Sequence, residues 1–235
     1  MKQVSQLALA VQLPDDETFD SFYGESHDVF LEQLKLFIQL HDEDASLPAS
    51  FYLFGIEGAG KSHLLHACCS FAESFGLTSL CLSLSEVSQL SVDVLDGLEH
   101  IDLICLDDIQ CIAQDPDWQR GVFDLYNRVT ESNKRIVISG NKSANDLGIT
   151  LPDLLSRLNW GYTEQVKSLD DKEKLETLQY RAQQRGVFLS DDVGKYLLNH
   201  FSRDLASLIK LLDDLDKASI REQRKITIPF IKEVL

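Results

Sequence analysis

The stretch Ser50–Ser62 reads SFYLFGIEGAGKS and contains the most specific pattern in the chain. Phe51–Phe54 is an apolar run of strand length, and Gly55 ends it. Gly55–Ser62 then matches G-x-x-x-x-G-K-[ST] at every fixed position, and His63–Ala67 continues as the first turns of a helix. A strand, a glycine-rich loop and a helix start in this order predict a phosphate-binding loop. The alternative is a glycine-rich turn that matches by chance.

Each residue type in this loop suits the binding of phosphate. Gly58 and Gly60 permit backbone conformations and a close approach that a side chain would prevent. Backbone N–H groups, with the helix N-terminus behind them, then surround a phosphate. Lys61 is expected to reach the terminal phosphates, and the Ser62 hydroxyl to hold Mg²⁺. The predicted nucleotide-binding residues of this stretch are Gly58, Ala59, Gly60, Lys61, Ser62 and His63.

Two later strands end in polar residues. Leu103–Leu106 is an apolar strand that ends in Asp107 and Asp108. Carboxylates at such a strand end, beside a phosphate loop, hold Mg²⁺, so Asp107 is expected to orient the metal through water and Asp108 to position the attacking water. Arg135–Ser139 is the next strand, and Asn141 after it is expected to contact the γ-phosphate or its water. The alternatives are a solvated strand end and a turn-forming Asn.

The order of the elements predicts an α/β fold. Short apolar strands alternate with helices as far as Tyr162–Val166, which implies a parallel sheet flanked by helices. From Leu169 onward the pattern is helical only, and this small domain is expected to pack on the sheet domain and cover the nucleotide. The predicted divisions are a flexible segment 1–14, an α/β domain 15–167 and a helical lid 168–235.

Several helices are predicted in detail. Residues 27–40 form a helix with one apolar face, and Trp118–Ser132 form another. Glu86–Gly97 is predicted to be a helix with a loose apolar pattern. In the lid, Asp170 and Ser190 are predicted to cap two helices, and Ser202 to cap a third that begins at Arg203.

Composition narrows the function. The 235 residues carry a formal net charge of −16, and residues 1–167 hold the whole surplus, with 10 Lys and Arg against 26 Asp and Glu. An acidic body repels a phosphate backbone, so direct DNA binding is not expected. No apolar run reaches the roughly 18 residues of a membrane span, and the acidic N-terminal region is unlike a signal peptide, so a cytoplasmic location is expected. The cysteines lack metal-ligand spacing and are interpreted as small buried hydrophobes: Cys68, Cys69, Cys81, Cys105 and Cys111.

The N-terminal segment Gln6–Val11 alternates polar or small residues with apolar ones. Such a peptide can add to a protein surface as an extended segment with two or three anchors. On pattern alone, an unstructured terminus is the favoured interpretation.

The chain resembles the AAA+ ATPases, and within them the family of the bacterial replication initiator DnaA. The resemblance spans roughly residues 15–220, and its matching elements are Thr18–Phe22, the phosphate loop with His63–Ala67, Leu106–Gln110 and Ser156–Gly161. Other segments resemble the DnaA-related proteins of regulatory inactivation of DnaA: Gln6–Val11, Leu13–Phe19, Asp124–Arg128, Leu151–Leu154 and Thr227–Phe230. The initiator continues into a helix-turn-helix DNA-binding domain, and here only the helical lid is expected.

The resemblance implies further site residues. Phe22 and Tyr23 match the segment that lines the adenine pocket of ADP or ATP. Arg157 matches the arginine finger that stabilises charge on a neighbour's γ-phosphate, with a structural helix Arg as the alternative. Arg203 matches the sensor-2 arginine that touches phosphate, with a solvent-exposed Arg as the alternative. Gln6, Leu7, Leu9 and Val11 resemble a peptide that binds the DNA polymerase III sliding clamp, although Ala10 and Val11 are smaller than the usual terminal residues.

Two functions follow from this resemblance. The first is a regulator of replication initiation that binds ADP or ATP with Mg²⁺, is bound to the sliding clamp, and stimulates ATP hydrolysis by DnaA through Arg157. The second is an autonomous AAA+ ATPase that acts as a loader or remodelling factor in DNA replication. Weak intrinsic hydrolysis is expected, because Asp108 is shorter than the Glu usual at active AAA+ sites. A homo-oligomer is left open.

Overall fold

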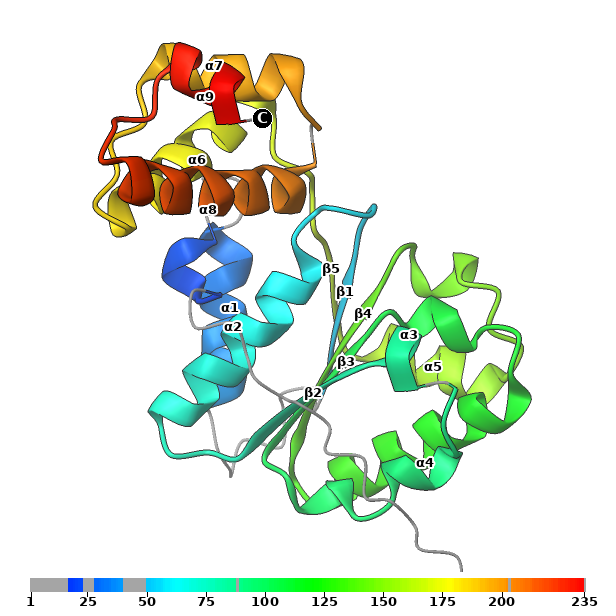
Figure 1. The fold of residues 1–235 in the computed structure, drawn as a ribbon. Helices are drawn as coiled ribbons and strands as arrows, with labels where there is room; N and C mark the ends of the chain where they lie inside the picture. Colours follow the sequence, from blue (N-terminus) through cyan, green and yellow to red (C-terminus); the bar gives the residue numbers. More distant parts are fainter. Residues whose placement is uncertain (1–16, 23–27, 40–49, 88, 203, 235) are drawn as a thin grey trace, which may run out of the picture.

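The computed structural model describes residues 17–22, 28–39, 50–87, 89–202 and 204–234. Within these residues, parallel strands form one five-stranded sheet in the order β2-β3-β4-β1-β5 (Figure 1). The strands are β1 (Ser50–Phe54), β2 (Ser79–Ser83), β3 (Leu103–Asp107), β4 (Arg135–Gly140) and β5 (Tyr162–Gln165). The predicted parallel sheet is confirmed. Because β4 lies between β3 and β1, the ends of all three strands meet at one edge of the sheet.

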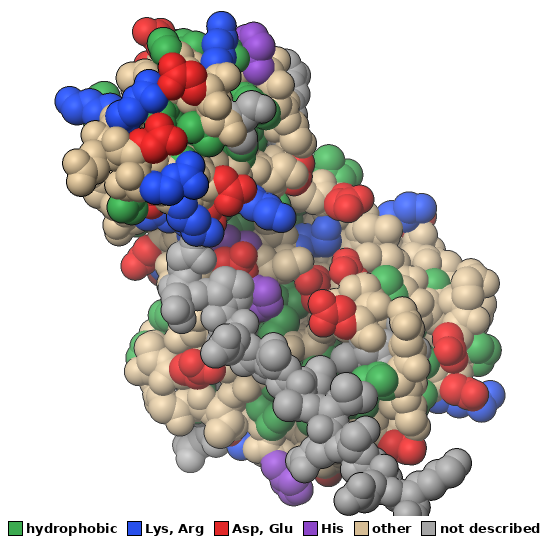
Figure 2. Space-filling model, viewed as in Figure 1, with side chains coloured by type: hydrophobic (Ala, Val, Ile, Leu, Met, Phe, Trp, Pro, Cys, Tyr) green, Lys and Arg blue, Asp and Glu red, His purple; other side chains and the backbone are tan. Residues whose placement is uncertain are grey.

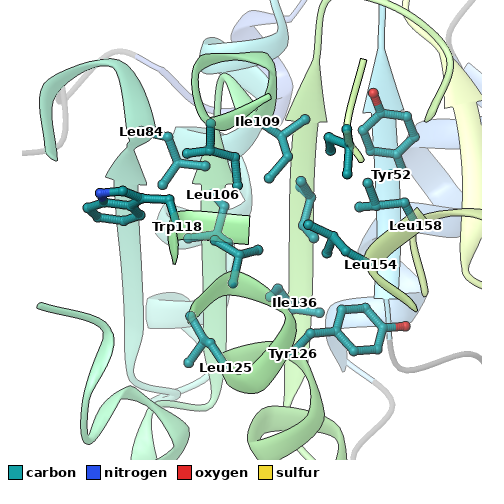
Figure 3. Close-up of a cluster of buried hydrophobic side chains, with 14 of the residues drawn as sticks. Tyr52, Leu84, Leu106, Ile109, Trp118, Leu125, Tyr126, Ile136, Leu154 and Leu158 are labelled. Atoms are coloured by element: carbon teal, nitrogen blue, oxygen red, sulfur yellow. The ribbon is translucent and has the colours of Figure 1, made fainter. Parts of the chain in front are cut away.

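Helices cover both faces of the sheet (Figure 1). One face carries α1 (Asp28–Gln39) and α2 (Lys61–Ser74), and the other carries α3 (Leu84–Val87), α4 (Pro116–Glu131) and α5 (Pro152–Trp160). Successive strand residues point to opposite faces, so Phe51 and Leu53 pack toward α1 and α2 while Tyr52 packs toward α4 and α5. Figure 3 shows the apolar cluster on the face that carries α3, α4 and α5, in which the side chain of Trp118 lies beside Leu84 and Leu106.

The predicted apolar face of α1 is confirmed, because each of its five residues is buried: Phe30, Leu31, Leu34, Phe37 and Ile38. Trp118 is buried as expected for a packing residue, whereas Trp160 at the end of α5 is 70% exposed and does not pack in the core.

The predicted helix Glu86–Gly97 is wrong. The helix α3 ends at Val87, and two short 3₁₀ helices follow, η3 (Val92–Leu95) and η4 (Leu98–His100). The Ser91 hydroxyl accepts a hydrogen bond from the N–H of Asp93, and Gly97 has a φ of +76°. Ser and Asp side chains that bond to nearby backbone, together with a left-handed glycine, favour turns over a continuous α-helix.

After β5 the described chain holds only helices, and these enclose a separate apolar core. They are α6 (Asp171–Gln184), α7 (Asp191–His200), α8 (Leu205–Glu222) and α9 (Ile228–Val234). Asp170 and Ser190 cap α6 and α7 as predicted. The prediction for α8 is wrong: Asp204 caps it, since its carboxylate accepts a hydrogen bond of 2.9 Å from the N–H of Ser207, and the Ser202 hydroxyl bonds the N–H of Asp204 instead. The predicted domain limits stay predictions.

The cysteines differ in burial. Cys68, Cys69 and Cys105 are buried as expected, and burial raises the pKa of Cys105 well above its ordinary value. Cys81 is half-buried, and Cys111 is exposed, which corrects the expectation that all five are buried. Cys111 lies on the surface 3₁₀ helix η5 (Ile109–Ile112), outside the sheet. All five are free thiols, and the described residues contain no His, Cys, Asp and Glu cluster fit to hold a metal.

None of the helices in the described ranges combines the length and the apolar character that crossing a bilayer requires.

Candidate functional site

The phosphate loop joins β1 to α2 with two glycines in the left-handed region. Gly58 has a φ of +76° and Gly60 a φ of +92°, which glycine adopts at low cost. At Gly60 there is also no room for a side chain, because a Cβ would lie 2.7 Å from Cε2 of Phe22. Gly60 is the N-cap of α2, so the first N–H groups of that helix border the loop. This arrangement matches an anion-binding helix start.

Lys61 opens α2 and is buried, with a relative exposure of 7%. Its ammonium donates hydrogen bonds of 3.0 Å to the backbone oxygens of Gly55 and Ile56, across the loop. An ammonium has three N–H bonds, so one donor remains for a further acceptor. Ser62, the next residue, lines the adjoining cleft.

Asp107 ends β3 and is buried, with a relative exposure of 6%. Its carboxylate accepts a hydrogen bond from the hydroxyl of Ser139, which lies on the neighbouring strand β4. The same hydroxyl accepts a bond of 3.1 Å from the N–H of Asp108. Ser139 therefore fixes the turn that follows β3 and the orientation of the Asp107 carboxylate.

Asp108 and Asn141 face the same cleft and are joined through a third side chain. The amide of Gln110 donates a hydrogen bond of 2.8 Å to the Asp108 carboxylate, and its oxygen accepts a bond of 3.1 Å from the N–H of Asn141. Asp108 has a φ of +61°, a left-handed conformation that Asp tolerates better than most residues. Sequence reasoning placed Asp108 and Asn141 but gave no role to Gln110, whose spacing two residues after Asp108 was the available signal.

A cleft of about 1060 Å³ lies between the phosphate loop and the helical region. Its walls carry Lys61, Ser62, Asp108 and Asn141 on the sheet side, and α8 forms the opposite wall through residues from Asp204 to Asp213. The helical region therefore borders the predicted phosphate site. A volume of this size suits a small-molecule ligand.

A small recess of about 30 Å³ adjoins the cleft behind the glycine loop. Phe22, Ala59 and His63 line it, and so does Arg181 from α6. The imidazole of His63 contacts the backbone oxygen of Thr18 at 3.0 Å through Nε2 and the Arg181 guanidinium at 3.3 Å through Nδ1. Since a guanidinium only donates, Nδ1 accepts and Nε2 carries the proton. Arg181 is buried on the apolar face of α6; a charged residue at such a position was the signal that sequence reasoning missed.

Arg157 lies on α5 and does not line the cleft. Its guanidinium carbon lies 5.8 Å from the ring centre of Tyr126 and 5.4 Å from that of Trp160. In the part of the chain that the structure describes, Arg157 forms no ion pair, whereas Arg128 on α4 pairs with Glu99. Arg157 is thus a half-buried cation held by aromatic faces.

The start of α5 is held by Gln119, which is buried on α4 with 1% exposure. Its amide donates to the backbone oxygens of Ile112 and Ala113, at 3.2 and 2.8 Å. Its oxygen accepts from the N–H groups of Thr150 and Leu151, at 3.1 and 2.9 Å. Leu151 is the N-cap residue of α5, so Gln119 links the helix that carries Arg157 to the core of the sheet domain.

Some predicted residues lie outside the described residues: Tyr23, Arg203 and the whole segment Gln6–Val11 with Gln6, Leu7, Leu9 and Val11. Figure 2 shows Asp and Glu side chains spread over the sheet region, while Lys and Arg side chains are prominent on the helical region. This agrees with the acidic surplus of residues 1–167.

Two family models match the chain. The model of the bacterial DnaA ATPase domain matches residues 13–165, and the model described as Hda, lid domain, matches residues 171–235. Among solved structures, domain III of Thermotoga maritima DnaA has 16% identity and a TM-score of 0.77, over 95% of this chain and 97% of its own. AMPPCP-bound DnaA from Aquifex aeolicus has 24% identity and a TM-score of 0.68, over 90% and 71%. A Thermotoga maritima RuvB variant has 15% identity and a TM-score of 0.68, over 94% and 71%. These structures share the fold.

Proposed function

The chain belongs to the DnaA-related AAA+ ATPase family and carries a lid domain of the Hda type, and from this premise we propose that it regulates replication initiation. It binds ADP or ATP in its own cleft and is attached to the DNA polymerase III sliding clamp. In that position it presents Arg157 to ATP-bound DnaA and accelerates hydrolysis in the DnaA site.

The observation that carries the proposal is the placement of Arg157. The guanidinium lies on α5, away from the residues of its own cleft, and forms no ion pair within the described residues. By contrast, Arg128 on the neighbouring helix α4 is paired with Glu99. A half-buried, permanently charged side chain without such a pair is available to an anionic group of another molecule.

The chain's own cleft suits a nucleoside diphosphate or triphosphate. The N–H groups of the glycine loop would surround a bound phosphate, and the remaining N–H of Lys61 would be able to donate to the terminal phosphate oxygens. Ser62 lines the cleft, and the buried Asp107 lies at the adjoining end of β3; their hydroxyl and carboxylate oxygens are of the kind that would hold Mg²⁺, Asp107 through a water molecule. A bound Mg²⁺ would neutralise part of the charge of the phosphates. The Phe22 ring lies close to Gly60 and lines the recess beside the loop, which supports the proposal that it contacts the adenine base.

The contribution of Arg157 in trans is electrostatic. Charge spreads over the equatorial oxygens of the γ-phosphate in the transition state, and a planar guanidinium can donate two parallel hydrogen bonds to them. Arginine fingers contribute about 10³–10⁵ in rate. Arg157 therefore stabilises the transition state of a site that it does not belong to.

Attachment to the clamp is assigned to the segment Gln6–Val11. The family resemblance supports this assignment, and the segment precedes the residues that the structure describes, which begin at Glu17. An extended peptide that docks through Gln6, Leu9 and Val11 would leave the nucleotide cleft unaffected.

An autonomous ATPase is the second candidate, and one contact favours it. Gln110 joins the Asp108 carboxylate to the backbone N–H of Asn141 at the cleft, and this link supports a role of these residues in positioning an attacking water. The two functions differ in which site hydrolyses ATP. ATP hydrolysis by the chain alone, measured without DnaA, should be lost in Lys61→Ala if the chain's own site performs it.

Arg157→Ala tests the proposal. We expect this variant to fold and bind ADP, yet to lose about 10³-fold or more of its stimulation of DnaA hydrolysis on clamp-loaded DNA. Arg157→Lys should also fail, because a point charge does not reproduce the planar fork. Arg120→Ala is the matched control, because Arg120 is an exposed arginine on α4 that is 3.7 Å from Asp117. Stimulation by Arg157→Ala equal to that of wild type would exclude the proposed mechanism.

The clamp assignment has a separate test. Gln6→Ala combined with Leu9→Ala should abolish binding to immobilised clamp in surface plasmon resonance while ADP binding is retained. Unchanged clamp binding would contradict this assignment and favour the alternative interpretation of Gln6–Val11 as an unstructured terminus.

A further inference from the structure

Trp160 is the last residue of α5 and is 70% exposed, which is unusual for tryptophan. The other tryptophan, Trp118, is 2% exposed and packs in the core shown in Figure 3. Among the described residues, Trp160 belongs to none of the apolar cores, so packing does not explain why an indole occupies this position.

The contact that Trp160 does make is with Arg157. Residues three apart on a helix lie on the same face, and the guanidinium carbon is 5.4 Å from the centre of the indole ring. Tyr126 contacts the guanidinium as well, at 5.8 Å. Both distances lie within the range of a cation–π interaction, for which tryptophan is the best partner.

The support beneath this contact is rigid. Tyr126 is buried, and its hydroxyl is hydrogen-bonded at 2.8 Å to the hydroxyl of Ser50 on β1. Gly161, directly after Trp160, packs so closely on Ser50 that a Cβ would lie 2.1 Å from its Oγ. The side chain of Asn159 bonds Asn145 at 3.1 Å. The end of α5 is therefore fixed to the sheet domain while the indole itself extends into solvent.

We propose that Trp160 is the positioning residue for Arg157: its ring holds the guanidinium in place before the γ-phosphate of DnaA-bound ATP arrives. This inference rests on the proposed function of Arg157. A free arginine loses much of its rotamer freedom when it is ordered, and a side chain held on a ring has lost part of that freedom in advance. The indole ring attracts the guanidinium but leaves its positive charge in place, whereas a carboxylate would neutralise that charge.

The test compares Trp160→Leu with Trp160→Phe in the full chain, with ATP-bound DnaA and clamp-loaded DNA. Leucine keeps an apolar side chain without a π face, and phenylalanine keeps the face. We expect Trp160→Leu to lower the maximal rate of stimulated hydrolysis about 2- to 30-fold, and Trp160→Phe to retain most of it. The concentration of the chain that gives half-maximal stimulation should change little. Phe188→Leu is the matched control, because Phe188 is an aromatic residue of the lid with 85% exposure.

A double variant separates positioning from general damage. If Trp160 acts through Arg157, then Arg157→Ala with Trp160→Leu should be no slower than Arg157→Ala alone. A further loss in the double variant would overturn the inference. So would a Trp160→Leu rate equal to wild type, a Trp160→Phe rate as low as that of Trp160→Leu, or a change confined to the half-maximal concentration, which would make Trp160 a docking contact. Activity of Arg157→Ala itself would instead refute the proposed function.

Discussion

Gln119→Leu should destabilise the sheet domain although it replaces a polar side chain with an apolar one of similar size. Gln119 is 1% exposed and bonds the backbone of two separate segments. Its loss removes a hydrogen-bond partner from the oxygen of Ala113 and from the N–H groups of Thr150 and Leu151. The oxygen of Ile112 still accepts the hydrogen bond from the N–H of Asp115, so it adds nothing to the loss of stability.

The three groups at about 1 kcal/mol each give a loss of about 3 kcal/mol in the free energy of unfolding. For a chain of this length, that corresponds to a fall of about 6–12 °C in Tm. Urea denaturation followed by circular dichroism measures the free energy. Gln114→Leu is the control, because Gln114 is exposed in the adjoining loop.

Gln119→Leu should also weaken the proposed stimulation of DnaA at temperatures where the variant is folded, because Leu151 is the N-cap residue of the helix that carries Arg157. A loss below about 1 kcal/mol, or the same loss in Gln114→Leu, would refute the claim that Gln119 anchors this helix.

Two further predictions concern the glycine loop and a surface ion pair. Gly60→Ala should abolish ADP binding in isothermal titration calorimetry, because the alanine Cβ would lie 2.7 Å from Phe22 and the backbone φ is +92°. Gly76→Ala is the control and should keep ADP binding, because Gly76 has a φ of +74° but open space around it. Equal ADP affinities of the two variants would contradict the argument. The hydrogen bond from Lys134 lowers the pKa of Asp102 to about 2 from an ordinary 3.8, so the carboxylate stabilises the fold above pH 4 and this contribution is lost as the pH falls toward 2. Asp102→Asn should therefore cost about 1 kcal/mol at pH 7, after allowance for solvent screening, and this cost should shrink as the pH falls through about 2; a difference that is constant with pH would contradict it.

The residues at the cleft were predictable because parallel strands end at a common edge. Asp108 and Asn141 follow β3 and β4, and the phosphate loop follows β1, so strand order alone brings them together. Local patterns carried this information: an apolar run, then a polar residue or a glycine loop. Their catalytic roles stay predictions.

The side chains that connect segments far apart in the chain were not predictable in this way. Gln119 reads as an ordinary polar residue of a helix, and only the packing of the segment at Thr150 against it explains its burial. Arg181 likewise reads as one charged residue among several until His63 is found beside it. The helix predicted beyond Val87 is wrong for another reason. The Ser and Asp side chains of this stretch bond to nearby backbone and so compete with the helix that its apolar residues favour.

The contrast between the two tryptophans gives the molecule an optical reporter. Both of its indoles absorb near-ultraviolet light, but Trp118 lies in an apolar core and Trp160 in water. Their emission should therefore separate into a blue component that follows unfolding and a red component that follows the surface around Arg157. Excitation at the red edge, or quenching by iodide, selects the second component, so the approach of the proposed partner DnaA to that surface can be timed without attaching a dye.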